Sequence, residues 1–189
     1  MSTSLQSVAD VCNYALAKIG FRLRVGSLYD GTPHAKKLLD VYGETRDAVL
    51  RGGDWDFALK SVTGGTPVGS PPYPWTTQYA YPTDCIRVRN VYDSSSIVDP
   101  YNPLPTLWTI ADDATYGKVI QVRNANTPTL VYTAQITNPA LWEPLFLDAV
   151  ASALGRNLRA IADKDDPNFI KLTDEEIAGA VKNASEVVG

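Results

Sequence analysis

The sequence predicts an α+β fold that is mainly α, with a four-helix bundle-like core and a small antiparallel β-sheet inserted between the second and third helices. Residues 1–60 and 138–189 carry apolar side chains at helical spacing. Residues 61–137 instead alternate apolar and polar residues between stretches rich in glycine and proline. We therefore expect one domain, residues 1–189, in which a β-rich excursion interrupts a helical bundle.

Two helices are expected before residue 60. The first starts after Ser4, a candidate N-cap, and ends before Gly20, a residue typical of helix C-termini. In the second, Thr32 is the expected cap, Pro33 occupies the first turn, and Gly43 weakens the middle. Each helix has an apolar stripe that predicts burial, formed by Leu5, Val8, Ala9, Cys12, Ala15, Leu16 and Ile19 in the first and by Ala35, Leu38, Leu39, Tyr42, Val49 and Leu50 in the second.

Residues 61–137 are expected to form the sheet and its loops. The segment GGTPVGSPPYPW, residues 64–75, has three glycines and four prolines, which indicate an exposed loop. In CIRVRNVY, residues 85–92, apolar residues alternate with polar ones, as in a half-buried strand. Two more strands are expected, in GKVIQVRN (117–124) and PTLVYTAQI (128–136).

Helical spacing returns at residues 138–164, where Asn138 or Trp142 precedes the helix and Pro144 lies in its first turn. A fourth helix is expected over most of residues 167–188. The third helix carries small residues that permit a close approach of a neighbouring helix, namely Ala149, Ala151, Ser152, Ala153 and Gly155.

Composition limits the function classes. The formal net charge is −4, and residues 141–189 contain 5 basic and 9 acidic residues. A net-acidic chain lacks the electrostatic footprint of a nucleic-acid binder, although like charge lets DNA pass without being gripped. We expect no membrane-spanning segment, because no run of roughly eighteen apolar residues occurs, and no signal peptide.

No cofactor or metal is expected. The chain has one histidine and two cysteines, so no zinc site of familiar spacing can be written. His34 lies in the polar first turn of a helix and is expected to be a surface residue. Cys12 and Cys85 are expected to be buried thiols rather than a disulfide.

The stretch RDAVLRGGDWDFALK, residues 46–60, places two aromatic residues between aspartates where the second helix ends. If the chain leaves the helix in extended form, Trp55, Phe57 and Leu59 are buried beneath the sheet as a structural plug, and the aspartates face water. If it forms a short helical turn, Trp55, Ala58 and Leu59 point inward. Either geometry predicts an aromatic plug.

Asp54 and Asp56 form the candidate carboxylate pair for catalysis. Two carboxylates can hydrolyse a glycosidic bond when they lie about 5–9 Å apart across a cleft. Residues two apart usually point in different directions, although Glu44 or Glu143 could supply a partner. We expect no enzyme and no catalytic residue; the alternative is a peptidoglycan hydrolase, or a structural protein with a lytic side activity, that uses acidic residues.

Aromatic residues also gather in and beside the proline-rich loop. One interpretation is a stacking or carbohydrate-binding surface. The favoured one is that they pin the loop against the sheet, with part of it forming an intersubunit contact. The candidate subunit or tail interface consists of Tyr73, Trp75, Tyr79 and Tyr101.

Several motifs, in order, resemble the head-to-tail adaptor family of tailed bacteriophages, the tail tubular protein A or tail accessory factor type. They are VCNYALAKIG, the stretch from YGETRDAVL to DWDFALK, YAYPTDCIRV, and LVYTAQITNP before the third helix. The resemblance spans about residues 4–185. Pro82 comes one residue early compared with the family pattern. Most of these motifs concern packing, so they bear on the fold more than on chemistry.

The resemblance implies a virion protein at the head–tail joint, present in the host cytoplasm before assembly. Such adaptors form a homo-oligomeric ring, usually of twelve subunits, beneath the portal protein. The ring extends the channel for double-stranded DNA without sequence-specific binding and offers a platform to tail or nozzle proteins; no membrane is involved. The implied portal-docking segment near the C-terminus includes Phe169, Ile170, Ile177, Val181 and Val188.

Overall fold

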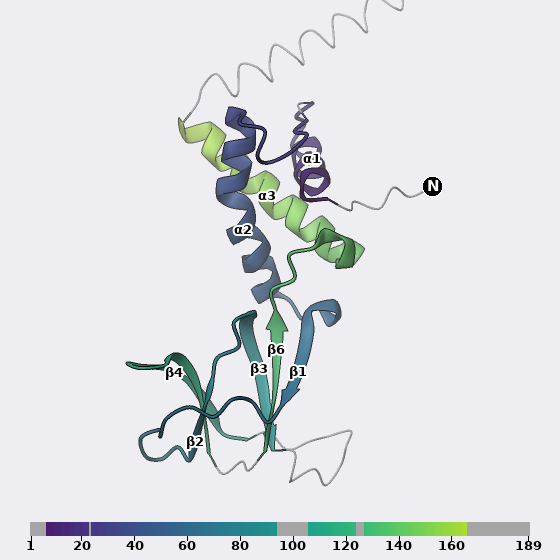
Figure 1. Cartoon of the computed structure of the whole chain (residues 1–189). Helices are drawn as coiled ribbons and strands as arrows, with labels where there is room; N and C mark the ends of the chain where they lie inside the picture. The colour runs from purple at the N-terminus through teal and green to yellow at the C-terminus, as the bar shows by residue number, and fades with distance from the viewer. Residues whose placement is uncertain (1–6, 23, 94–105, 124–126, 166–189) are drawn as a thin grey trace, which may run out of the picture. The chain divides into compact units, whose positions relative to one another are not determined.

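The chain divides into two compact units (Figure 1). We call residues 1–49 and 136–189 the helical unit and residues 50–135 the sheet unit. The sequence placed these boundaries near residues 60 and 138; the chain after residue 49 instead belongs with the sheets. The computed structural model describes residues 7–22, 24–93, 106–123 and 127–165.

The predicted four-helix bundle-like core is wrong. The described residues form three α-helices and two three-stranded antiparallel sheets, which lie in the chain between the second and third helices. The sequence pattern missed β1 (Leu59–Thr63) because all five of its residues are exposed and show no alternation, and β2 (Thr77–Ala80) because it has only four residues. It also missed β4 (Trp108–Asp113). The fourth helix expected over 167–188 lies outside the described residues.

The first helix, α1 (Val8–Lys18), begins later than predicted. Ser7, not Ser4, is its N-cap: the Ser7 hydroxyl accepts a hydrogen bond from the Asp10 N–H at 3.1 Å. The Asp10 carboxylate accepts one from the Ser7 N–H, also at 3.1 Å, which completes a capping box. The helix therefore starts after Ser7, where the backbone N–H groups of Ser7 and Asp10 both find an acceptor.

The other two helices begin where the sequence predicts. In α2 (Pro33–Gly52), the Ala35 N–H donates to Oγ1 of Thr32 at 3.2 Å, as expected of a cap. The short 3₁₀ helix Pro139–Leu141 follows Asn138, and Pro144 is the first residue of α3 (Pro144–Asp165). Residues 50–52, at the end of α2, are counted with the sheet unit.

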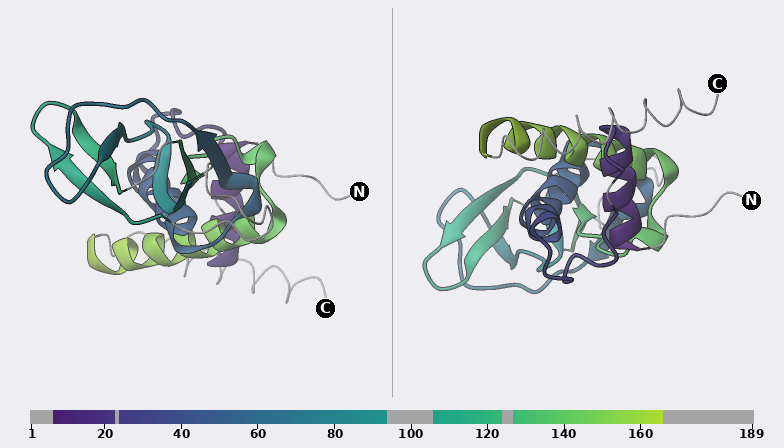
Figure 2. Two further views of the ribbon diagram at one scale, coloured as in Figure 1. Left: turned by 90° about the horizontal axis from the view of Figure 1, so that it is seen from below. Right: turned by 90° about the horizontal axis from the view of Figure 1, so that it is seen from above.

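Helices α1 and α3 cross at close range in the helical unit (Figures 1 and 2). A Cβ atom on Gly155 would lie 2.9 Å from Cγ2 of Ile19 and 3.3 Å from the Ala15 carbonyl oxygen. The close approach predicted from the small residues of α3 is confirmed at this position. At the same interface, the Tyr14 hydroxyl donates to Asp148 at 2.8 Å.

The sheet unit contains two sheets. The first has the strand order β1–β6–β3, with β3 at Cys85–Asp93 and β6 at Pro128–Ala134. The second has the order β2–β5–β4, with β5 at Gly117–Val122. Every pairing is antiparallel. The three strands expected from alternation correspond to β3, β5 and β6, so these predictions are confirmed.

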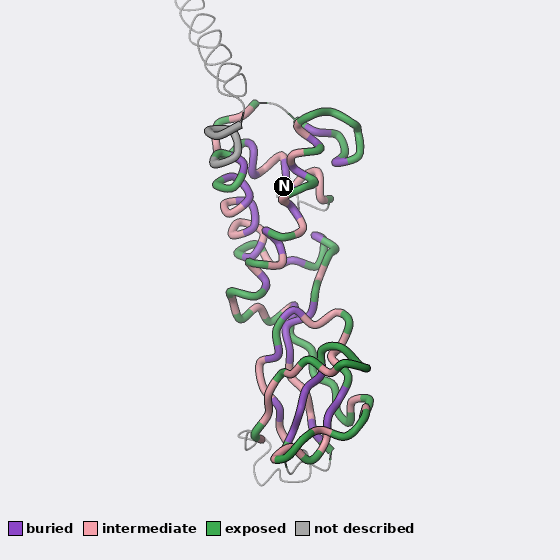
Figure 3. The backbone as a smooth tube through the Cα atoms, turned by 90° about the vertical axis from the view of Figure 1, so that its left-hand side faces the viewer, coloured by how far each residue is buried: buried purple, intermediate pink, exposed green. Residues whose placement is uncertain are grey.

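The two sheets share one hydrophobic core. Val88 and Val91 from β3 pack with Tyr79 from β2 and with Ile120 and Val122 from β5. Figure 3 shows buried segments inside both units, so each unit has an interior of its own. The sheet unit is therefore a small β-sandwich rather than a single sheet resting on helices.

None of the helices in the described part of the chain is long and apolar enough to cross a membrane.

Candidate functional site

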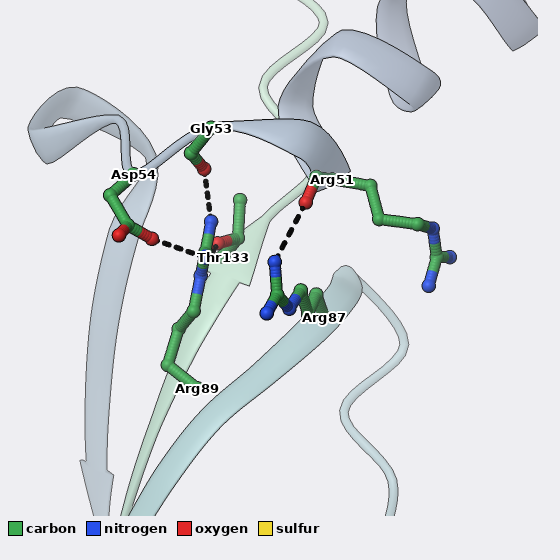
Figure 4. Close-up of polar contacts among 6 residues, drawn as sticks. All are labelled: Arg51, Gly53, Asp54, Arg87, Arg89 and Thr133. Atoms are coloured by element: carbon green, nitrogen blue, oxygen red, sulfur yellow. Dashed lines mark hydrogen bonds and ion pairs between the residues drawn. The ribbon is translucent and has the colours of Figure 1, made fainter.

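Two arginines of β3 hold the chain where it leaves α2 (Figure 4). Arg89 donates a hydrogen bond to the Gly53 carbonyl and pairs with the Asp54 carboxylate. Its Nε donates to Oγ1 of Thr133 on β6 at 2.7 Å. Arg87 donates to the Arg51 carbonyl at 3.1 Å. Because the last carbonyls of a helix lack intrahelical partners, cationic donors satisfy them well.

The aromatic plug is partly as predicted. The chain forms a 3₁₀ turn at Asp56–Ala58, which is the helical alternative, and Ala58 is fully buried. Trp55 and Phe57 are half-buried. Leu59 is 51% exposed, so its predicted burial is wrong: β1 begins at this residue on an exposed edge of the sheet.

The Trp55 ring lies against Gly53. A Cβ atom at position 53 would lie 2.5 Å from Nε1 of Trp55. A side chain at position 53 therefore overlaps the indole ring and forces the ring to move.

The two aspartates lie at the surface, beside a depression of about 390 Å³ lined in part by Arg89, Asn90 and Tyr92. The Asp54 side chain is 87% exposed, and Asp56 is also exposed. A catalytic acid is normally kept protonated by an apolar site or a neighbouring carboxylate. Asp54 has a guanidinium beside it instead, which is the surrounding of a structural ion pair.

Asp84 is the other organised carboxylate of the sheet unit. It accepts hydrogen bonds from Nζ of Lys60 at 2.5 Å and from the Tyr132 hydroxyl at 3.0 Å. The Lys60 contact holds the pKa of Asp84 below its usual value, and Tyr132 adds to this effect. Burial raises the pKa of Tyr132 to about 12, so its hydroxyl remains a donor. The cluster ties β1, β3 and β6 together at one end of the first sheet.

The candidate interface residues separate into different surroundings. Tyr73 is 94% exposed, Trp75 is half-buried, and Tyr79 is 8% exposed within the sandwich core. Tyr79 therefore serves the core and cannot be a surface anchor. Tyr101 lies outside the described residues.

An apolar cavity of about 470 Å³ opens between the two sheets. It is lined by side chains from both, including Val62, Tyr81, Ile120 and Leu130. The Lys118 ammonium lies 5.3 Å from the centre of the Tyr81 ring. Sequence reasoning missed this cavity, because it depends on how two sheets face each other.

A second pocket, of about 460 Å³, lies in the helical unit at the start of α1. The Tyr42 hydroxyl beside it is buried and has no hydrogen-bond partner among the described residues. Burial raises the pKa of Tyr42 to about 12. Arg46, also buried, donates from Nε to Asp47 at 2.7 Å. The sequence offered one signal: an arginine four residues after Tyr42 on the apolar stripe of α2.

Metal-ligating side chains do not gather in the described part of the chain, where no group of three or more could hold an ion. His34 is half-buried in the first turn of α2. Both cysteines are free thiols: Cys12 is fully buried and Cys85 is half-buried. Burial raises the pKa of Cys12 to about 12, so this thiol remains protonated and unreactive at neutral pH.

The sequence matches no known protein-family model. A search of curated proteins finds no relative either.

Proposed function

We propose that this chain is a structural adaptor of a tailed bacteriophage, which joins the portal to the tail and extends the DNA channel as an oligomeric ring. The observation that carries the proposal is the order of the motifs in the sequence, together with the places of their residues in the fold. An adaptor requires a rigid scaffold with outward contact surfaces, and its recurring residues should serve packing.

The first motif, VCNYALAKIG, supports this requirement. The Asn13 side chain accepts from the Val25 N–H at 2.9 Å and donates to the Val25 carbonyl at 3.0 Å. Asn13 thereby holds the loop that follows α1. Cys12 lies in the core, and Tyr14 reaches Asp148 of α3. All three residues act inside the helical unit.

The next motifs hold the sheet unit in the same way. Trp55 of DWDFALK lies against Gly53, and Asp84 of YAYPTDCIRV binds Lys60 and Tyr132. Tyr79 fills the sandwich core. The motif residues thus make contacts within their own unit. Such contacts are expected where the members of a family share a scaffold.

Exposed apolar side chains supply surface for partners. Several large apolar residues are more than half exposed, and each offers apolar surface that a partner can cover. They lie in both units and include Tyr29, Tyr73, Leu107, Leu141 and Leu145.

Negative charge suits a channel protein. The formal net charge of −4 gives DNA no broad basic surface to adhere to. In this proposal, the double-stranded DNA passes through the ring lumen without sequence-specific binding. Docking to the portal is assigned to the segment containing Phe169 and Ile177, and the tail or nozzle proteins bind elsewhere on the ring.

The test is negative-stain electron microscopy of this chain mixed with the portal protein from the same genome. Closed rings seated on the portal are the expected result. Free portal and free chain across a wide concentration range would contradict the proposal. In that case, peptidoglycan cleavage by the wild type that is lost in Asp54→Asn or Glu143→Gln, both still folded, would favour the hydrolase alternative.

A further inference from the structure

Two of the four edge strands of the sandwich are covered. On β2, the Gln78 carbonyl accepts a hydrogen bond from the Val68 N–H at 3.0 Å, and loop residue Pro67 bridges Tyr79. On β3, the Val91 carbonyl accepts one from the Thr106 N–H at 2.9 Å. These contacts come from loops, and covering an edge in this way is how natural sheets avoid unwanted pairing.

The other two edges are open. Within the described residues, the backbone of β1 pairs only with β6, and that of β4 pairs only with β5. One side of each strand therefore presents N–H and C=O groups that have no backbone partner among the residues that the structure describes. The strands are similar in length, with five residues in β1 and six in β4.

Exposed apolar side chains accompany the open edges. On β1, Leu59 is 51% and Val62 is 40% exposed. On β4, Ile110 is 43% exposed, and Leu107, immediately before the strand, is 66% exposed. An uncovered edge with exposed apolar residues is a template for pairing with another chain.

The open edges lie on opposite sides of the sheet unit. Figure 1 shows β4 at its left and β1 at its right, and the left view of Figure 2 agrees. They also differ in charge. Strand β1 carries Lys60, whose side chain pairs with Asp84 and stays 49% exposed, whereas β4 ends with Asp112 and Asp113. The β1 edge is therefore closer in charge complementarity to a β4 edge than to another β1 edge.

We infer that β1 of one copy pairs with β4 of a second copy of this chain. The contact is heterologous, so each copy offers one edge and accepts the other. Repetition of such a contact closes into a ring if the rotation between copies allows it. The inference names the contact between neighbouring copies in the proposed ring. Its role in a ring therefore rests on the proposed function.

The test uses one variant for each edge. Ser61→Glu adds a negative charge to the β1 edge, which faces the acidic β4 in this pairing, and Ile110→Lys adds a positive charge to the β4 edge, which faces Lys60. Self-association of the full chain is measured by sedimentation velocity over a concentration series. We expect each substitution to weaken association about tenfold or more. Ala17→Glu and Ala17→Lys are the charge-matched controls, since Ala17 is exposed on α1 in the helical unit.

Mixing the two edge variants identifies the pairing. Each variant alone should associate more weakly than the wild type, because the charge added to one of its edges opposes the contact. The mixture should associate more tightly than either variant alone, since the intact β4 of the Ser61→Glu chain can pair with the intact β1 of the Ile110→Lys chain. Association in the mixture also shows that both variants are folded.

Three results would overturn the inference: a wild type that stays monomeric up to its solubility limit, edge variants that assemble like the wild type, or a mixture that associates no more tightly than either variant alone. Because no portal is present, none of these results depends on the adaptor proposal. Conversely, a chain that self-associates through its edges but ignores the portal would leave the pairing intact and contradict the proposed function.

Discussion

At the residue scale, a few polar side chains determine the path of the backbone. Arg89 joins three separate acceptors, namely the Gly53 carbonyl, the Asp54 carboxylate and the Thr133 hydroxyl. Its side chain is only 14% exposed, whereas that of Asp54 is 87% exposed. The value of Arg89 therefore lies in its buried hydrogen bonds rather than in the exposed ion pair.

Replacing Arg89 should be costly, and replacing its ion-pair partner should not. We expect Arg89→Met to lower the free energy of unfolding by about 2–3 kcal/mol, because the buried Thr133 hydroxyl and the half-buried Gly53 carbonyl lose their charged donor. Asp54→Asn should change it by less than about 0.5 kcal/mol. Urea denaturation followed by tryptophan fluorescence measures both, since three of the four tryptophans lie in the sheet unit. Equal losses in the two variants would contradict this explanation.

The contact of Trp55 with Gly53 gives a second prediction. Gly53→Ala should destabilise the chain by about 1–3 kcal/mol, because the new methyl group overlaps the indole ring and forces it to move. Gly52→Ala is the matched control: a Cβ there meets nothing within 4 Å, so its cost should be small. The urea midpoints of Gly53→Ala and Gly52→Ala are compared. Similar midpoints would mean that the Trp55 ring moves aside without a cost in stability.

The lowered pKa of Asp84 should make the free energy of unfolding depend on pH in the acid range. Its hydrogen bonds from Lys60 and Tyr132 lower its pKa in the folded chain below the reference value of 3.8. The stabilisation is therefore fully present above about pH 4 and is lost as the pH falls through the lowered pKa, where the folded state must also take up the proton. Urea denaturation from about pH 5 to about pH 2 should show the wild type converging on Asp84→Asn. A stability difference that is constant with pH would show that the contact is not electrostatic.

At the element scale, helices with strong caps and strands with one buried face were predictable. The positions of α2, α3, β3, β5 and β6 follow from Thr32, Pro144 and the alternating apolar residues. The start of α1 was misjudged, because both Ser4 and Ser7 are acceptable caps and only Ser7 is followed by an acidic residue at the third helical position. Strand β1 could not be predicted, because an exposed edge has no alternation.

The candidate sites were harder to predict than the elements. The sequence identified Trp55 and the two aspartates as a unit, but not Arg89, which lies thirty-five residues further along the chain than Asp54. The cavity between the sheets and the pocket beside Tyr42 both depend on tertiary packing. Such features have no local pattern in the sequence, because their residues meet only after the sheets and helices have packed.

The crossing of α1 and α3 is tested by two identical substitutions. Gly43→Ala lies in the middle of α2 with open space around it, so it should stabilise the chain by about 0.5–1 kcal/mol through helix propensity. Gly155→Ala should lose that gain, because its methyl group meets Ile19 and the Ala15 carbonyl. Thermal unfolding should therefore rank Gly43→Ala above the wild type and Gly155→Ala at or below it. The reverse order would mean that the two helices separate without cost.

At the scale of the whole molecule, each unit has a core of its own. Exposed large apolar residues lie in both units, and three of them lie on the edge strands β1 and β4, namely Leu59, Val62 and Ile110. A protein that acts through contacts on several faces is consistent with a place between the portal and the tail.

The most direct test of this function is the number of copies bound per portal, measured by native mass spectrometry of the portal mixed with this 20.5 kDa chain. We expect one dominant complex in which a full ring of chains is bound to each portal, with few partly loaded species. A spectrum containing only free portal and free chain at every mixing ratio would contradict the adaptor function.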